Sequence, residues 1–177
     1  AALALHGRTR EDMYLNTARY DLIKEVKSLL SIPVIANGDI DSPQKAKYVL
    51  DYTAADAVMI GRAAQGRPWI FREIAHYLAT GEELAAPNIQ EVKDVLLGHL
   101  QELYEFYGEY SGCRISRKHI AWYTKGLRSS NEFRQQMYQV ENTQDQFKVV
   151  EAYFNQLFDY GEIMSDVQVE SVDLLQP

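Results

Sequence analysis

Three short apolar runs without polar alternation stand out in residues 1–75. They are Leu3–Leu5, Ile32–Ala36 and Ala57–Ile60. Runs of this kind are typical of strands in a parallel sheet that is buried on both faces. Helical patterns separate them: one lies near Tyr20–Leu30, and another begins at Ser42-Pro43, a capping residue followed by proline at the first helical position. The pattern predicts consecutive βα units.

After Thr80-Gly81 the pattern becomes purely helical. Asn88 and Glu91 form a capping box, and apolar residues then recur at helical spacing up to Tyr107. Two further boxes, each predicted to open a helix, are Ser129 with Glu132 and Thr143 with Gln146. The last helix is expected over about residues 145–160, and its buried side is expected to contain Phe147, Val150, Tyr153, Phe154 and Leu157.

Three βα units do not close a sheet, and a (β/α)₈ barrel takes about 250 residues. The chain also begins inside an apolar run. We therefore predict an α/β fold: the last three βα units of a TIM barrel, followed by an all-α helical bundle, as the last part of a longer protein. The expected domains are residues 1–82 for the partial barrel, 83–160 for the helical domain and 161–177 for a loosely held acidic tail.

Composition narrows the function classes. No stretch of the 177 residues approaches the roughly 20 apolar residues of a membrane span, so we expect no membrane contact. A single cysteine excludes an internal disulfide or a thiolate zinc site and favours a reducing, cytoplasmic location. The net charge of −7 argues against a wholly basic nucleic-acid binder. Residues 113–134, however, hold six basic residues and one acid, Glu132.

Polar clusters follow each predicted strand: residues 6–10 (His-Gly-Arg-Thr-Arg), then Asn37-Gly38-Asp39, then Gly61-Arg62. Ligands of parallel α/β folds bind at this end of the strands. Glycine permits a close backbone approach or a sharp turn, and Arg62 with backbone N–H groups after Gly61 would suit a phosphate. The alternative is that each cluster is ordinary turn chemistry. Three clusters at matched strand ends favour a binding site.

The cationic stretch predicts a second surface. On a helical wheel Arg114, Arg117, Lys118 and Lys125 share an arc about 100° wide, which fits contacts to a phosphate backbone. The alternative is a solvated face. Tyrosines of the helical part, such as Tyr104, Tyr107 and Tyr110, are expected to be packing residues. No metal-ligand spacing, Walker loop or Gly-x-Gly-x-x-Gly motif is present, so we expect no metal site and no Rossmann site.

Five segments carry a resemblance to a known family. Residues 32–40 (IPVIANGDI) and 55–64 (ADAVMIGRAA) resemble the final two strands of the FMN-dependent tRNA-dihydrouridine synthases, and residues 6–10 resemble the end of their sixth strand. Residues 65–71 (QGRPWIF) and 114–123 (RISRKHIAWY) are similar to the bacterial B-type members, and the second of these is the more discriminating. The resemblance covers residues 1 to about 160.

The resemblance implies both a cofactor and a substrate. FMN would be held by Asn37, Gly38, Asp39, Gly61 and Arg62, with His6 near the flavin, and tRNA by Arg114, Arg117, Lys118, His119 and Lys125. The family reduces a uridine of tRNA to 5,6-dihydrouridine, with NADPH recharging the flavin.

In the family, the active-site cysteine that protonates the uracil ring and the lysine next to the flavin lie on earlier strands. The resemblance therefore implies no catalytic residue in this chain, which is expected to be inactive alone. Cys113 lies in the helical part and is expected to be a small, partly buried thiol. We expect a monomer. Two alternatives remain open: a non-catalytic RNA-binding helical module on a barrel remnant, and a phosphate-binding barrel enzyme for a small metabolite.

Overall fold

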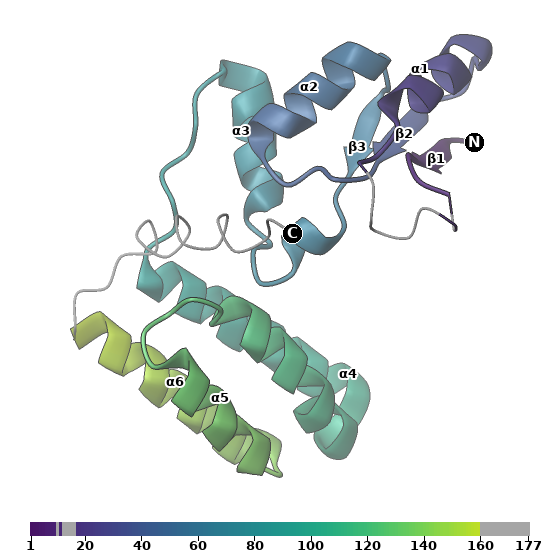
Figure 1. Cartoon of the computed structure of the whole chain (residues 1–177). Helices are drawn as coiled ribbons and strands as arrows, with labels where there is room; N and C mark the ends of the chain where they lie inside the picture. Colours follow the sequence, from purple (N-terminus) through teal and green to yellow (C-terminus); the bar gives the residue numbers. More distant parts are fainter. Residues whose placement is uncertain (10, 12–16, 160–177) are drawn as a thin grey trace. The chain divides into compact units, whose positions relative to one another are not determined.

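The computed structural model describes residues 1–9, 11 and 17–159 and divides the chain into two compact units (Figure 1). Residues 1–84 form the barrel unit and residues 85–177 form the helical unit. Arg10, which belongs to the first polar cluster, and the acidic tail at 161–177 lie outside the described residues. The two units are treated separately below.

The barrel unit is built on a parallel three-stranded sheet with β2 in the middle. Its strands are β1 (Leu3–His6), β2 (Val34–Asn37) and β3 (Ala57–Met59). In the parallel register His6 lies opposite Asn37, and Asn37 lies opposite Met59. The carboxyl ends of the three strands therefore meet at one edge of the sheet.

Helices follow each strand of the barrel unit. They are α1 (Tyr20–Leu29), α2 (Pro43–Thr53) and α3 (Ile70–Thr80), the last preceded by a short 3₁₀ turn, η1 (Arg62–Ala64). At the start of α2 the Ser42 side chain accepts a hydrogen bond from the Lys45 N–H at 3.2 Å, as its sequence predicts. This arrangement confirms the predicted βα units.

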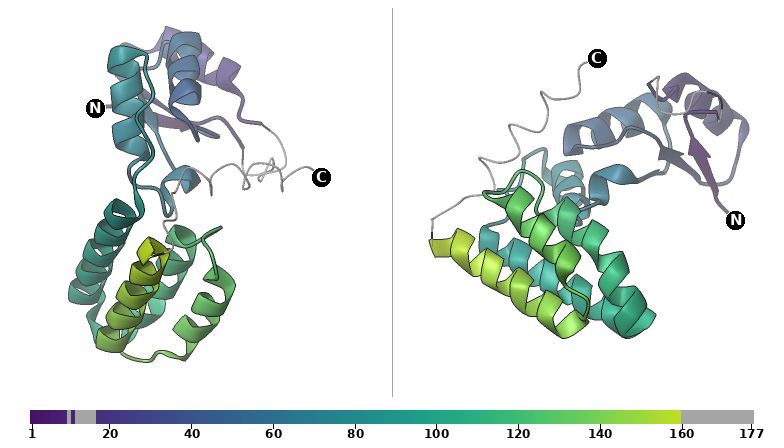
Figure 2. Two further views of the ribbon diagram at one scale, coloured as in Figure 1. Left: turned by 90° about the vertical axis from the view of Figure 1, so that its left-hand side faces the viewer. Right: turned by 60° about the horizontal axis from the view of Figure 1, so that its bottom comes forward.

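One expectation for the strands is wrong. The continuous apolar runs predicted burial on both faces, but within the described residues α1, α2 and α3 cover one face of the sheet only (Figure 2). In β2, Val34 and Ala36 point to that face and are fully buried, whereas Ile35 and Asn37 are half-exposed. Strands of a barrel keep apolar residues on both faces. The apolar run of β2 therefore predicts burial of both faces, whereas these three helices bury only one.

The helical unit contains α4 (Ile89–Tyr123), α5 (Ser130–Gln139) and α6 (Thr143–Asp159). Helix α4 starts at the predicted capping box, with Asn88 and Glu91 exchanging two hydrogen bonds of 2.9 Å. The helix is then interrupted at Gly108, whose φ of 73° lies in the left-handed region. Residues 89–107 and 109–123 form two antiparallel arms, because His99 of the first arm meets His119 of the second, with ring centroids 4.7 Å apart. The unit is therefore a four-membered bundle.

A second glycine brings the arms of α4 together. A Cβ on Gly112 would lie 3.1 Å from the Tyr104 Cα and 3.2 Å from the Leu103 carbonyl oxygen. Gly108 thus permits the reversal, and Gly112 permits the close approach beyond it.

The core of the helical unit contains a polar centre at Gln146. Its side-chain oxygen accepts hydrogen bonds from Ser116 and from the Tyr104 hydroxyl, and its amide nitrogen donates to the Cys113 carbonyl at 3.1 Å. Apolar residues surround it: four of the five predicted for α6 are buried, and Phe147 is half-buried.

Two predicted caps differ in detail. Ser129 precedes α5 in a left-handed conformation and makes no side-chain cap, and α6 is capped by Asn142, which accepts from the Asp145 N–H at 2.8 Å. Gln146 was paired with Thr143 in the predicted box, but its side chain is buried in the core instead. Among the described residues, no helix has the length and apolar character to cross a membrane.

Candidate functional site

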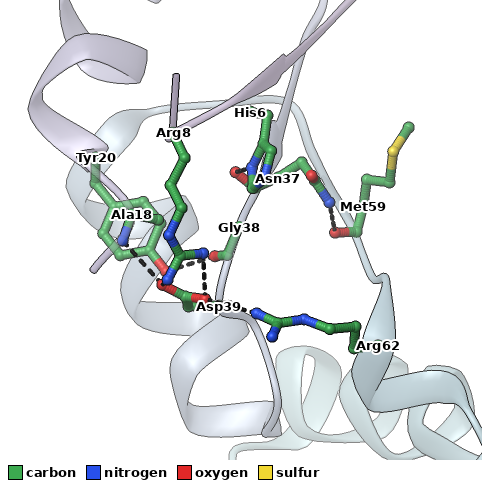
Figure 3. A network of polar contacts seen from close by, with 9 residues as sticks. All are labelled: His6, Arg8, Ala18, Tyr20, Asn37, Gly38, Asp39, Met59 and Arg62. Atoms are coloured by element: carbon green, nitrogen blue, oxygen red, sulfur yellow. Dashed lines mark hydrogen bonds and ion pairs between the residues drawn. The ribbon is translucent and has the colours of Figure 1, made fainter. Parts of the chain in front are cut away.

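The three strand ends of the barrel unit carry the predicted polar residues, and a chain of hydrogen bonds connects them (Figure 3). The Asn37 side-chain amide donates to the Met59 carbonyl at 2.7 Å, which ties β2 to β3. The His6 Nδ1 lies 3.2 Å from the Asn37 carbonyl oxygen, which ties β1 to β2. His6 and Asn37 thus lie next to each other at the carboxyl ends of their strands.

Asp39 is the centre of this cluster. Its carboxylate accepts hydrogen bonds from the Arg8 guanidinium at 2.6 Å and from the Ala18 N–H at 2.8 Å. A second guanidinium, that of Arg62, lies 3.4 Å from the same carboxylate. One acid therefore holds two arginines, Arg8 from the segment after β1 and Arg62 from η1, which follows β3 (Figure 3).

The charge state of Asp39 follows from these contacts. Partial burial works to raise the pKa of its carboxyl, but the hydrogen bonds from Arg8 and Ala18 and the two positive charges outweigh it. The pKa of Asp39 is therefore lowered from its ordinary value of 3.8, and the group is ionised at neutral pH.

The structure gives Arg8 a role that the sequence did not. Arg8 belongs to the first polar cluster but received no role of its own, whereas its side chain is only 6% exposed and meets the Asp39 carboxylate through two nitrogens. The register of the strands indicates this contact. In neighbouring parallel strands, the residues that lie two positions after a pair of opposite residues also come close together. Arg8 and Asp39 follow the paired residues His6 and Asn37 by that interval.

Gly38 and Gly61 have different reasons to be glycine. Gly38 has a φ of +126°, and a Cβ there would lie 2.8 Å from the Ala18 Cβ and 3.1 Å from the His6 ring. Its carbonyl also accepts a hydrogen bond from the Tyr20 hydroxyl at 2.7 Å, so Gly38 is fixed by the turn and by its own packing. A Cβ on Gly61 would meet no described atom within 4 Å, so Gly61 faces open space.

Arg62 follows Gly61 at the start of η1. Its side chain is 60% exposed and is steered toward Asp39. The open space at Gly61, the exposed guanidinium of Arg62 and the polar side chain of Asn37 form a surface suited to an anion with hydroxyl groups beside it. This donor set fits the phosphate and ribityl parts of FMN, which the resemblance implies.

The four cationic side chains predicted to contact RNA divide into two groups. Arg114, Lys118 and Lys125 are exposed. Arg117 is half-buried, and its guanidinium donates to the Val140 carbonyl at 2.9 Å, which fastens the end of α5 to α4. The helical wheel applies only as far as Tyr123, where α4 ends. Lys125 therefore lies in the following turn and not on the arc. Contacts of all four with RNA stay predictions.

His119 belongs to an aromatic cluster. Its ring packs edge-on against Trp122, with centroids 5.0 Å apart, and against His99. Burial, followed by the nearby charges of His99 and Lys118, lowers the pKa of His119 to about 4. His119 is therefore neutral at pH 7 in this chain.

The expectation that the tyrosines pack inside holds for one of three. Tyr104 is half-buried and bonded to Gln146, but Tyr107 is exposed and Tyr110 is 72% exposed. Both exposed rings lie next to the reversal at Gly108, where the arms leave little core to cover them. Cys113 is buried as expected, and burial raises the pKa of its thiol.

Three parallel βα units with a polar, cation-bearing edge, joined to a helical bundle, are the arrangement expected for the last part of a TIM barrel with an attached helical domain. A family model described as "Dihydrouridine synthase (Dus)" matches residues 1–158 of the chain. The chain belongs to the dihydrouridine synthase family, which confirms the resemblance.

Individual relatives support the same assignment. A protein described as "tRNA-dihydrouridine synthase B" from Vibrio vulnificus is 58% identical over 154 residues, which are 87% of this chain and 48% of the relative. The proteins of that name from Shewanella oneidensis and Xanthomonas axonopodis pv. citri are 56% and 55% identical over 157 residues, 89% of this chain. The chain spans about half the length of the curated relatives it matches.

Proposed function

We propose that the chain is the C-terminal half of a flavin-dependent tRNA-dihydrouridine synthase, referred to below as the full-length enzyme. In this proposal the strand ends of the barrel unit hold part of FMN, and the helical unit contacts tRNA. The enzyme would act as a cytoplasmic monomer. The observation that carries the proposal is the open, cation-flanked strand end at Gly61 and Arg62.

The roles at this edge follow from the contacts. Backbone N–H groups after Gly61 and the Arg62 guanidinium would hold the phosphate, because a Cβ on Gly61 would meet open space and the Arg62 side chain is 60% exposed. Asn37 and His6 would lie beside the remainder of the cofactor. Asp39 would act as a positioning residue, since it holds Arg8 in place and steers Arg62.

When bound, FMN supplies the hydride for reduction of the uracil ring, with NADPH as the source. This chain's own residues would bind and orient the cofactor. Among the residues of this chain none takes the role of the family's proton-donating cysteine, because Cys113 is buried in the helical unit. We therefore expect the 177-residue chain alone to form no dihydrouridine from unmodified tRNA, FMN and NADPH.

A second candidate function is RNA binding without catalysis. It is favoured by the exposed cations Arg114, Lys118 and Lys125 on a unit that is otherwise acidic. In that case the barrel unit would serve as a scaffold, and its strand ends would bind no flavin.

Arg62→Ala in the full-length enzyme separates the two. Loss of a charge-assisted contact to phosphate should cost about 1.5–3 kcal/mol of FMN binding free energy, which is about a ten- to 150-fold rise in Kd. Flavin fluorescence during titration of the apoenzyme measures it. Arg72→Ala is the matched control, because Arg72 is an exposed arginine of the same unit on α3.

An unchanged flavin affinity for Arg62→Ala would show the phosphate assignment to be wrong. Failure of the wild-type full-length enzyme to bind FMN at all would favour the RNA-binding alternative.

A further inference from the structure

The second arm of α4 carries a regular row of four side chains that the phosphate-contact prediction does not explain. Tyr110, Arg114, Lys118 and Trp122 follow one another at intervals of four residues. Side chains at this spacing lie on neighbouring turns of one helix face. Tyr110, Arg114 and Lys118 are exposed and Trp122 is half-exposed. We name this row the aromatic–cation stripe.

Each cation of the stripe lies on an aromatic ring. The Arg114 guanidinium carbon is 5.4 Å from the centroid of Tyr110, and the Lys118 Nζ is 5.8 Å from the ring of Trp122. Contacts of this kind hold long side chains along the helix before any ligand arrives. The stripe is therefore ordered as a surface, in which Tyr110 is 72% exposed and Trp122 is half-exposed.

Trp122 has a firm support. His119 packs edge-on against it, and His119 in turn packs against His99 of the first arm. His99 also lies 3.3 Å from the Tyr123 hydroxyl. The indole is therefore held by the His119 ring, which is itself packed against the first arm, and a fixed indole suits a platform on which a flat ligand stacks.

The charge around the stripe identifies the class of ligand. Residues 110–125, which contain the stripe, hold four basic residues and no acid, within a chain of net charge −7. A polyanion complements this stretch, whereas an apolar protein surface would leave the two cations without a partner. Here two aromatic rings flank two cations, and accessible rings beside cations are a pattern by which proteins bind unpaired nucleotides, because each base offers a π-face and each linkage a phosphate.

We propose that the aromatic–cation stripe binds an unpaired segment of RNA, with bases stacked on Tyr110 and Trp122 and phosphates held by Arg114 and Lys118. The stripe is about 18 Å long at 1.5 Å per residue, enough for several nucleotides. The inference rests on the proposed function in taking the RNA to be the tRNA substrate. It adds that the nucleotides held here are unpaired ones, recognised by stacking and not by duplex shape alone.

The test uses the chain with Trp69→Phe, so that Trp122 is its sole tryptophan. An oligouridylate of about 12 nucleotides is titrated at low salt, and a duplex RNA of equal length serves for comparison. Stacking should quench the Trp122 emission with the single strand more than with the duplex. Tyr110→Leu should then weaken oligouridylate binding about tenfold, a typical effect of removing one stacked base.

Two further variants complete the test. Tyr138→Leu is the matched control, because Tyr138 is an equally exposed tyrosine of the same unit on α5, outside the stripe. It should leave the affinity unchanged. Lys118→Ala should make the log–log salt dependence shallower by about 0.7, the value for one phosphate of a single strand. Since Tyr110 is largely exposed, its truncation leaves the core intact, and circular dichroism checks this.

The proposal is overturned if Tyr110→Leu binds oligouridylate as the control does, or if saturation with the single strand leaves Trp122 emission unchanged. It is also overturned if duplex RNA binds as tightly as oligouridylate and Tyr110→Leu weakens the binding of neither RNA. A third contrary outcome is that Tyr110 mediates only self-association of the chain. Flavin content and dihydrouridine formation by the full-length enzyme are measured in parallel. Loss of the stacking effect with activity retained refutes this inference alone, whereas stacking without any flavin or activity refutes the proposed function alone.

Discussion

Asp39→Asn tests the ion pair that organises the strand ends of the barrel unit. The substitution keeps the shape of the side chain but removes its charge, so the Arg8 guanidinium, 6% exposed, loses its ion pair with this carboxylate. A hydrogen bond to a charged group contributes about 1.5–3 kcal/mol. Breaking a fully buried pair costs about 3–5 kcal/mol. Asp39 keeps 25% exposure, so we expect a loss of about 2–3 kcal/mol in the free energy of unfolding of this unit.

The assay uses the distribution of the two tryptophans. Trp69 lies in the barrel unit and Trp122 in the helical unit, so urea unfolding followed in Trp122→Phe and Trp69→Phe backgrounds reports each unit in turn. Asp39→Asn should lower the Trp69 midpoint and leave the Trp122 midpoint in place.

The effect should also depend on pH in a defined direction. The folded-state pKa of Asp39 is lowered, so the stabilisation is fully present above the ordinary value of 3.8 and is lost as the pH falls through the folded value. The wild-type barrel unit should therefore be more stable than the Asp39→Asn variant at neutral pH, and this difference in stability should disappear only in acid. A stability difference below about 0.5 kcal/mol at pH 7, or equal shifts of both midpoints, would refute the assigned role.

Two further predictions use the same readout. Gly38→Ala places a Cβ 2.8 Å from the Ala18 Cβ at a φ of +126°, so it should destabilise the barrel unit by at least about 2 kcal/mol; a smaller drop in the Trp69 midpoint would contradict the steric argument. Arg117→Met removes the hydrogen bond to the Val140 carbonyl, so it should lower the free energy of unfolding reported by Trp122 by about 1–3 kcal/mol. Its effect on the salt dependence of RNA binding should be smaller than that of Lys118→Ala, and an equal effect would mean that Arg117 leaves Val140 to contact phosphate.

The features that the sequence predicted well are local ones. The caps at Ser42 and at Asn88 with Glu91 depend on residues within one helical turn, and both form as expected. The strands are found because their apolar runs are bounded by turn residues. In both cases the deciding interactions lie within a few positions along the chain.

The features that the sequence missed depend on distant contacts. Arg8 and Asp39 are 31 positions apart, and only the register of β1 against β2 brings them together. Arg117 lies on the expected arc, but the carbonyl that it binds comes from the end of α5, which a helical wheel does not contain. The sequence pattern does not indicate the reversal at Gly108, because helical spacing resumes directly after it in a stretch of similar composition.

The reversal of α4 bears on the order of folding. Contacts between its arms join residues close in sequence, such as Gly112 with Tyr104 and His99 with His119. Pairing β1 with β2 must instead bring Leu3 to Val34, with α1 formed in between. Because folding slows as contacts become more distant in sequence, the two arms of α4 should pair with each other before β1 pairs with β2. A hairpin of helices in the later part of the chain would thus form while the strands that precede it are still unpaired.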